Sequence, residues 1–181
     1  MNHRNGLVRH YTVYTAAGEP LTQASESPDV VAPPRTPRQL ARLTTLQQVM
    51  SNEVTCALPD LALEAVLDLM IRHRIGCLPI VDRVRRPLGI VTKMDLVELV
   101  GAQILATSGP IPDDLRSRTA DDIMMPIALT LPETSSVADA AKMMSLEDTH
   151  HVLVVTVDGR LSGVVSTHAI VTWLVDTEHP S

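Results

Sequence analysis

Hydrophobic and polar positions change their spacing in the same order twice along the chain, first over residues 45–96 and again over residues 119–170. Short apolar runs predict strands, and apolar residues at three-to-four spacing predict amphipathic helices. In chain order, the first copy predicts a strand at 54–58, a helix at 63–71, strands at 77–81 and 88–92, and a helix at 94–105. Each copy is thus predicted to run strand, helix, strand, strand, helix.

The second copy repeats this order and adds a strong turn signal. Its predicted elements are a strand at 128–131, a helix at 137–144, strands at 152–157 and 161–166, and a helix at 169–175. Asp158-Gly159 lies between the two later apolar runs, which is typical of a β-hairpin. Each copy alone is small for a stable core, so we expect the two sheets to pack on each other.

The N-terminal part has a different composition. Residues 18–37 are rich in Pro, Ser, Glu and Thr and cannot bury enough surface to offset their ordering entropy, which predicts a flexible arm. Residues 7–15 alternate weakly, so a strand and a tail that docks on a partner both remain open. The predicted organisation is an arm at 1–42, a first repeat at 43–105, a linker at 106–118, a second repeat at 119–176 and a tail at 177–181.

Composition limits the classes of ligand and partner. The chain is 45% hydrophobic but has one Trp, two Tyr and no Phe, so any ring-shaped ligand would pack on aliphatic walls. A net charge of −6 and few aromatic side chains argue against nucleic-acid binding. No window approaches the ~20 apolar residues of a membrane span, so we expect no membrane association and a cytoplasmic location.

Motifs for catalysis and metal binding are missing from the sequence. It contains no G-x-S-x-G, H-E-x-x-H or P-loop pattern, and we expect no enzyme activity. Cys56 and Cys77 match no metal or redox spacing. His150, His151 and His168 are candidate metal ligands, but the adjacent pair points to opposite faces of a strand and no Cys or Glu completes the set, so no metal site is predicted.

Four motifs in fixed order resemble those of a tandem pair of CBS (cystathionine-beta-synthase) domains, a Bateman module. They are Val49-Met50, Pro59 before the first helix, Leu78-Pro79-Ile80-Val81-Asp82, and Gly89-Ile90-Val91-Thr92-Lys93-Met94-Asp95. The resemblance covers roughly residues 43–175. It implies an α+β fold in which two repeats pack as a pseudo-two-fold pair with clefts between their sheets, and it implies a homodimer.

The resemblance also implies an adenosine-type ligand such as AMP, ADP, ATP or S-adenosylmethionine. The hydroxyl of Thr92, at a helix start, can bond a phosphate beside outward-pointing amides. Asp95, one turn later, can accept two hydrogen bonds from a ribose diol. The ordinary alternatives are that Thr92 only caps the helix and that Asp95 only offsets its dipole.

The second repeat departs from this pattern. Ser166 keeps the hydroxyl, but Ala169 replaces the carboxylate, so one nucleotide site per chain is expected, built around Asp95. The resemblance places His150 and His151 near the phosphate, although Leu153 stands where Pro is usual and weakens that register. The full predicted nucleotide-binding set is Val54, Ala57, Gly76, Pro79, Thr92, Asp95, His150, His151 and Ser166.

The predicted function is a non-catalytic regulatory module that binds an adenosine-type nucleotide and signals its occupancy to a separate regulated protein. An alternative of a different class is a ligand-free scaffold that uses the pair for dimerisation. Ala169 and Leu153 keep this alternative open, because both weaken the ligand-binding pattern of the second repeat.

Overall fold

The computed structural model describes residues 13–14, 20–21, 36–106, 115, 117–126 and 128–178. The chain divides into two compact units, Met1–Pro34 and Arg35–Ser181. In the first unit, β1 (Val13–Tyr14) pairs with β2 (Pro20–Leu21) in an antiparallel ladder, so these residues of the predicted flexible arm are strands. The other predictions for residues 1–35 lie outside the described residues.

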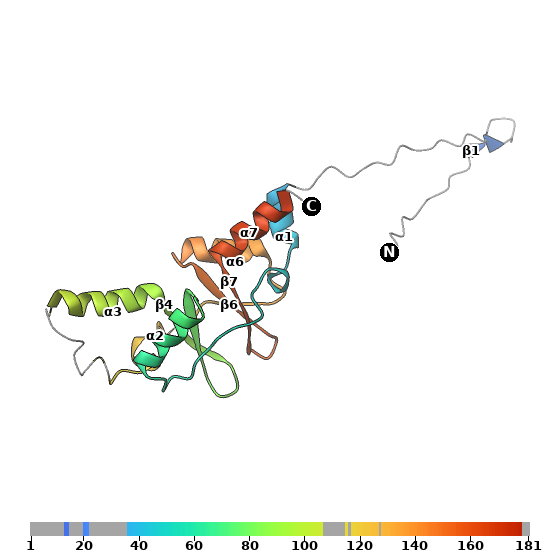
Figure 1. Cartoon of the computed structure of the whole chain (residues 1–181). Coiled ribbons are helices and arrows are strands. Elements are labelled where there is room, and N and C mark those ends of the chain that lie inside the picture. The colour runs from blue at the N-terminus through green and yellow to red at the C-terminus, as the bar shows by residue number, and fades with distance from the viewer. Residues whose placement is uncertain are drawn as a thin grey trace. The chain divides into compact units, whose positions relative to one another are not determined.

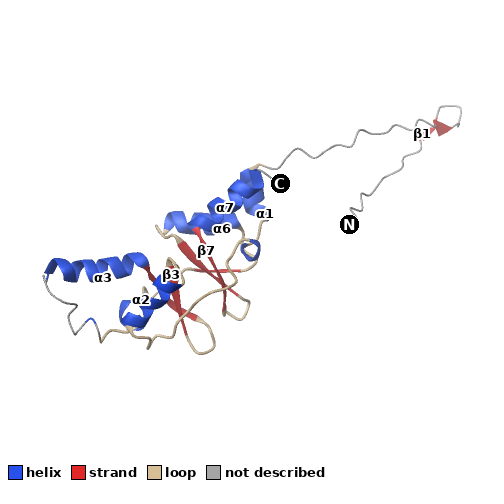
Figure 2. Cartoon of the chain, viewed as in Figure 1, coloured by secondary structure: helices blue, strands red, loops and turns tan. Residues whose placement is uncertain are grey.

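The second unit holds both repeats; the second has the predicted order of elements, and the first has it except for its first strand (Figures 1 and 2). The elements of residues 36–106 are α1 (Pro37–Leu43), the 3-10 helix η1 (Leu46–Gln48), α2 (Leu63–Arg72), β3 (Cys77–Val81), β4 (Pro87–Thr92) and α3 (Lys93–Ala106). Those of the second repeat are α5 (Ala120–Ile123), β5 (Thr130–Pro132), α6 (Val137–Leu146), β6 (His151–Val155), β7 (Leu161–Ser166) and α7 (Thr167–Glu178).

The two sheets differ in their first strand. In the second repeat β5 pairs parallel with β6, and β6 pairs antiparallel with β7. In the first repeat the strand expected at 54–58 is reduced to one bridge between Ala57 and Ile80 beside the β3–β4 hairpin. Pro79 explains the loss: Leu153 N–H donates to Leu129 O at 2.9 Å, whereas the equivalent Pro79 has no N–H.

Both hairpins bend at equivalent places. The ladder is irregular at Ile80/Val81 in the first repeat and at Val154/Val155 in the second. Gly159, with φ of 75°, closes the predicted Asp-Gly turn, as a left-handed position favours glycine. The predicted hairpin between β6 and β7 is therefore confirmed.

The segment that opens each repeat pairs with the other repeat. Ser51 and Val164 exchange backbone hydrogen bonds of 3.0 and 3.3 Å, and the equivalent Ile90 and Met125 exchange bonds of 3.1 and 2.9 Å. Close contact follows, since a Cβ on Gly163 would lie 2.4 Å from Met50 Sδ. This reciprocal exchange gives the pair its pseudo-two-fold relation.

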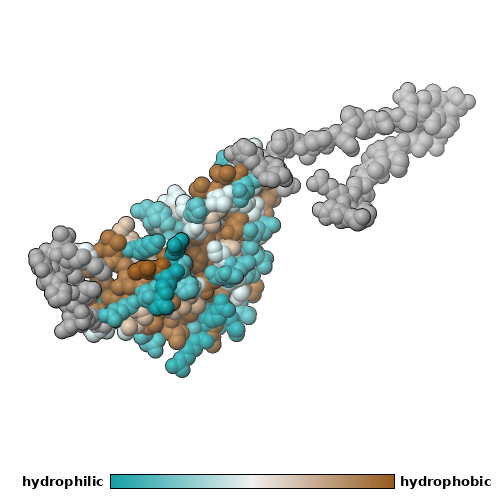
Figure 3. Space-filling view, viewed as in Figure 1, coloured by the Kyte–Doolittle hydropathy of each residue, from teal (hydrophilic) through white to brown (hydrophobic). Residues whose placement is uncertain are grey.

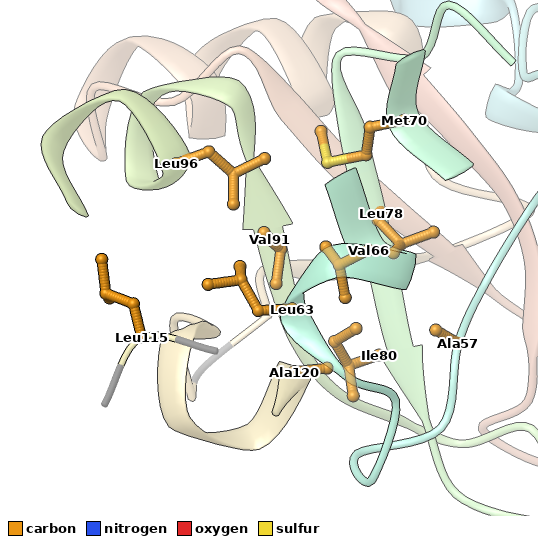
Figure 4. Packing of buried hydrophobic residues seen from close by; sticks show 10 residues of the cluster. All are labelled: Ala57, Leu63, Val66, Met70, Leu78, Ile80, Val91, Leu96, Leu115 and Ala120. Carbon is orange, nitrogen blue, oxygen red and sulfur yellow. The ribbon is translucent and has the colours of Figure 1, made fainter. Parts of the chain in front are cut away.

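The exchange also builds two mixed cores and an inter-sheet layer. Figure 4 shows the first core, where Leu115 and Ala120 join buried residues of the first repeat such as Val66 and Leu78. In the second core, Leu46 packs with residues of the second repeat. A third cluster joins the sheets through residues that include Cys77, Val81, Ile90, Leu153 and Leu161.

The flexible arm predicted at residues 1–42 ends earlier in the structure, because Pro37–Leu43 form helix α1. Thr36 and Gln39 form a capping box, and Pro37 occupies the first turn, where its missing N–H has no cost. Ala41 packs against the second core. Most of the predicted linker and the last three residues of the tail lie outside the described residues, while Leu115 of the linker is buried.

Candidate functional site

The strand-to-helix junctions of the two repeats share a backbone arrangement but differ in one carboxylate. In the first, Asp95 Oδ2 accepts hydrogen bonds from the Thr92 N–H at 2.6 Å and from the Thr92 hydroxyl at 2.8 Å. In the second, Ser166 Oγ accepts from the Ala169 N–H at 3.1 Å. The capping role considered for Thr92 is present, because its hydroxyl also accepts from the Asp95 N–H at 3.4 Å, and the second junction keeps only the hydroxyl.

A cavity of about 590 Å³ opens beside the second junction and is lined by both repeats. Its size falls within the ~300–1,000 Å³ range of small-molecule sites. Its apolar lining consists of Val54, Ile75, Cys77, Pro79 and Val164. Its polar lining consists of Ser51, Glu53, Thr55, Arg74, His150, His151, Ser166, Thr167 and His168, and Gly76 completes it. The cavity therefore offers aliphatic walls and a polar rim to one ligand.

Two buried or half-buried groups in the lining are held uncharged. Burial, with smaller contributions from His150 and Lys93, lowers the pKa of His151 from its usual value. Burial raises the pKa of Cys77 to about 12, so its thiol is protonated at neutral pH. Arg74 and Glu53, which are exposed, are the lining residues that carry full charges of opposite sign at neutral pH.

The structure divides the predicted nucleotide-binding set between different places. Six of its members line this cavity: Val54, Gly76, Pro79, His150, His151 and Ser166. Ala57 belongs to the first core instead. Thr92 and Asp95 sit at the other junction and do not line the cavity, so the expected grouping of Asp95 with these six is not found there.

The reciprocal exchange explains this division. Because residue 51 pairs with the last strand of the second repeat, residues 53–55 face the Ser166 junction and not the Thr92 junction. The sequence analysis does not include Glu53, Thr55, Thr167 and His168 in the site for this reason. If the exchange is assumed, the repeat offset predicts which opening segment meets which junction and could have found them.

The positions related by the pseudo-two-fold to the lining of this cavity differ in side-chain size and in charge. Leu153, which is 1% exposed, stands where the cavity has Pro79. Asp148 stands where the cavity has Arg74, and Lys93 stands where it has Thr167. Within the cavity itself, the imidazole of His151 lies close to Gly76, since a Cβ there would be 3.2 Å from Nε2.

The family model described as CBS domain matches residues 46–102 and again residues 120–176, which together make up more than half of the chain. The chain belongs to the CBS domain family. The fold is accordingly that of a tandem CBS pair, as the sequence predicted. Each matched range begins at the opening segment that pairs with the other repeat.

The CBS pair is similar to several known proteins. It is 30% identical over 125 residues to an uncharacterized protein of Methanopyrus kandleri, covering 69% of this chain and 60% of that protein. It is 35% identical over 60 residues to a homoserine O-acetyltransferase of Methanococcoides burtonii, covering 33% of this chain and 12% of that enzyme. The chain thus spans 60% or less of the length of these two relatives.

A solved CBS domain pair in complex with 5′-methylthioadenosine and S-adenosyl-L-methionine has the same fold. It is 25% identical to this chain with a TM-score of 0.60, and the match covers 75% of this chain and 98% of that one. Within the described ranges, no three His, Cys, Asp or Glu side chains are grouped to hold a metal ion. None of the described helices is both long and apolar enough to span a membrane.

Proposed function

We propose that this CBS pair is a non-catalytic regulatory module that binds an adenosine-type ligand in the cavity beside Ser166 and signals its occupancy to a separate protein. The observation that carries the proposal is the cavity itself, because it is lined by both repeats and combines aliphatic walls with a polar rim. The CBS pair solved with 5′-methylthioadenosine and S-adenosyl-L-methionine supports the ligand class.

The walls suit a nucleobase that is held without aromatic stacking. The cavity is lined by Val54 and Pro79 of the first repeat and Val164 of the second. A flat base between them would bury apolar surface away from water on both faces. Polar groups then fix its orientation, as in small-molecule sites generally. The hydroxyls of Ser166 and Thr167, at the start of α7, can bond the ribose or a phosphate.

The Thr92–Asp95 junction is proposed as a second, weaker site. It keeps the carboxylate that can accept hydrogen bonds from a ribose diol, but the buried Leu153 stands where the cavity beside Ser166 has Pro79. We therefore expect one ligand per chain at moderate concentrations. The candidate ligands are AMP, ADP, ATP and S-adenosylmethionine.

A ligand in the cavity would change the balance between arrangements of the two repeats. It contacts Gly76 and Pro79 on one side and Ser166 on the other, so the arrangement that closes on it is stabilised over the rest. We propose a homodimer as the form that transmits this change. Equivalent helices α3 and α7 carry apolar residues that are more than half exposed, namely Met94, Val97, Val171 and Val175. Hydrophobic side chains, coloured brown, reach the surface among the described residues in Figure 3.

The dimer is tested by placing a charge on this surface. Val171→Glu should convert a dimer to a monomer in sedimentation velocity, because a buried unpaired carboxylate is costly at an interface. Thr156→Glu, on the β6–β7 turn, provides a control that adds the same charge elsewhere. A wild-type protein that sediments as a monomer would overturn the proposed dimer.

The ligand proposal is tested by isothermal titration with the four candidate ligands. Thr55→Trp should block the cavity and abolish binding, because Thr55 is half-buried in its lining. Leu129→Trp is the matched control: it is half-buried at the equivalent position of the second repeat and should leave binding intact. Circular dichroism checks the fold of both variants. No binding of any ligand to the wild-type protein would favour the dimerisation scaffold.

A further inference from the structure

The turn of the first hairpin has an arginine where the equivalent turn of the second hairpin has glycine. Arg85 N–H donates to Asp82 O at 2.9 Å, and Gly159 N–H donates to Thr156 O at the same distance. Both residues are left-handed, with φ of 67° at Arg85 and 75° at Gly159. This conformation suits glycine and costs free energy in a residue that has a side chain. The backbone at Arg85 is therefore strained.

Arg85 joins the first hairpin to the second repeat through two hydrogen bonds. Its carbonyl accepts from the Leu161 N–H at 2.7 Å, and its guanidinium Nη2 donates to the Leu161 O at 3.2 Å in a partly buried position. Asp82 shapes the turn for this contact, because its Oδ1 accepts from the Val84 and Arg86 N–H groups at 2.9 and 2.7 Å. One strained residue thus binds both backbone groups of Leu161.

The pseudo-two-fold cannot repeat this contact on the other side of the pair. The residues equivalent to Arg85 and Leu161 are Gly159 and Pro87. Gly159 has no side chain to act as a donor, and Pro87 has no N–H. The strained arginine therefore ties the two repeats together at one hairpin and not at its equivalent.

The contact lies at the ends of two strands that wall the cavity. β3 lines the cavity with Pro79 and leads into the turn that holds Arg85. β7 begins at Leu161 and lines the cavity with Val164. Because Ser51 also exchanges backbone hydrogen bonds with Val164, β7 is tied to the first repeat both at its first residue and where it meets the cavity.

We infer that Arg85 is a positioning residue for the ligand cavity: its bonds to Leu161 hold β7 in place against the first repeat, so that the space between Pro79 and Val164 is formed before a ligand enters. The inference rests on the proposed function, because it concerns the same cavity. A preformed cavity binds more tightly, since less of the binding energy is used to bring its walls together. Folding stability need not change in parallel, because removal of the side chain also removes the strain of the left-handed backbone.

Arg85→Gly tests the inference, because glycine suits the left-handed turn and keeps the carbonyl but lacks the guanidinium. The melting temperature should change by less than about 4 °C, since the lost hydrogen bond and the released strain act in opposite directions. The affinity for AMP in isothermal titration of the full chain should fall about three- to tenfold. An affinity within about twofold of the wild-type value would overturn the inference.

Arg83→Gln is the matched control for the lost charge. Arg83 is exposed two residues earlier in the same turn and does not line the cavity, so this variant should bind AMP as the wild-type protein does. An equal loss of affinity in Arg83→Gln and Arg85→Gly would contradict the inference, because it would assign the effect to the charge of the turn and not to the bond with Leu161.

Amide hydrogen exchange without ligand separates this inference from the proposed function. The Leu161 N–H donates to Arg85 O, and the Val164 N–H donates to Ser51 O. Both amides should exchange at least about threefold faster in Arg85→Gly than in Arg83→Gln, because β7 opens more often once the guanidinium bond is lost. Equal exchange in the two variants would overturn the inference. If the wild-type protein binds no AMP, the proposed function fails, and the exchange measurement alone decides whether Arg85 holds β7.

Discussion

Each of the two junctions of this CBS pair has one feature of a nucleotide site, either room for a base or a carboxylate for the ribose. The cavity beside Ser166 has the room for a base, but Ala169 stands where the other junction has a carboxylate. The Thr92–Asp95 junction has that carboxylate, but the buried Leu153 stands where the cavity has Pro79. Two copies of one sequence pattern can therefore diverge in the side chains around equivalent junctions.

The comparison also separates fold from ligand binding. The backbone bonds that support the two junctions are equivalent: Lys93 N–H donates to Gly76 O at 3.1 Å, and Thr167 N–H donates to His150 O at 2.9 Å. The side chains around these bonds differ in size and charge, as Arg74 and Asp148 do. Packing thus preserves the pseudo-two-fold in the main chain, while the lining of each cleft is free to change.

The largest expected effect comes from the glycines at the exchanged segments. A Cβ on Gly89 would lie 2.6 Å from the backbone oxygen of Met125, whereas the nearest atoms to a Cβ on Gly163 belong to the Met50 side chain. Gly89→Ala should therefore cost about 3 kcal/mol of unfolding free energy and Gly163→Ala about 1–2 kcal/mol, because backbone yields less than a side chain. Urea denaturation measures both. Equal losses would show that the two exchanged contacts tolerate overpacking alike.

A smaller effect is expected from restoring the carboxylate to the second junction. Ala169→Asp should increase the affinity of the cavity for AMP by about tenfold, roughly 1.4 kcal/mol, because a ribose diol can donate two hydrogen bonds to the new carboxylate. Titration of 2′-deoxy-AMP is the control and should show little gain. A similar gain for both ligands would mean that the ribose diol does not face residue 169.

Removing the carboxylate from the first junction should chiefly affect stability. Asp95→Ala deletes the acceptor of the Thr92 N–H and hydroxyl bonds and should cost about 1 kcal/mol, typical of a lost helix cap. The affinity of the cavity beside Ser166 should not change, because Asp95 does not line it. Thermal unfolding and titration with AMP test the two statements. Loss of AMP binding would instead place the ligand at the Thr92–Asp95 junction.

The smallest effect concerns the equivalent positions 77 and 151. The pKa of His151 in the folded protein is lowered by burial, His150 and Lys93, so the unfolded chain binds this proton more readily. His151 should therefore reduce stability as the pH falls below its unfolded pKa of ~6.5. His151→Cys, which copies residue 77, should weaken that loss in urea titrations at pH 7.5 and 5.5. An unchanged pH dependence would assign it to other groups.

The sequence predicted the order of elements well and the composition of the site less well. Apolar spacing and the Asp158-Gly159 turn defined the helices and hairpins, because these signals are local. The prediction of a full first strand in the first repeat was wrong because of Pro79. The missing N–H of this residue matters only once its partner in the ladder is known. Helix α1 had a readable start at Thr36 and Pro37, but the polar composition before it hid that signal.

The grouping of site residues depended on contacts that no local pattern contains. Gly76, Pro79, His150 and Ser166 were recognised from the family motifs and do meet at the cavity. Asp95 was expected beside them because sequence alone does not show that the opening segments of the two repeats are exchanged. The pairing of Ser51 with Val164 decides which junction each segment faces, and it is a long-range contact.

The central claim is that the adenosine-type ligand binds beside Ser166 and not beside Thr92. The most direct test is a titration of ¹⁵N-labelled protein with AMP, followed by amide chemical shifts. The account predicts saturable shifts at Gly76, Thr167 and His168, which lie at the cavity, with little change at Met94 and Asp95. Shifts concentrated at Met94 and Asp95, with Thr167 and His168 unmoved, would contradict it.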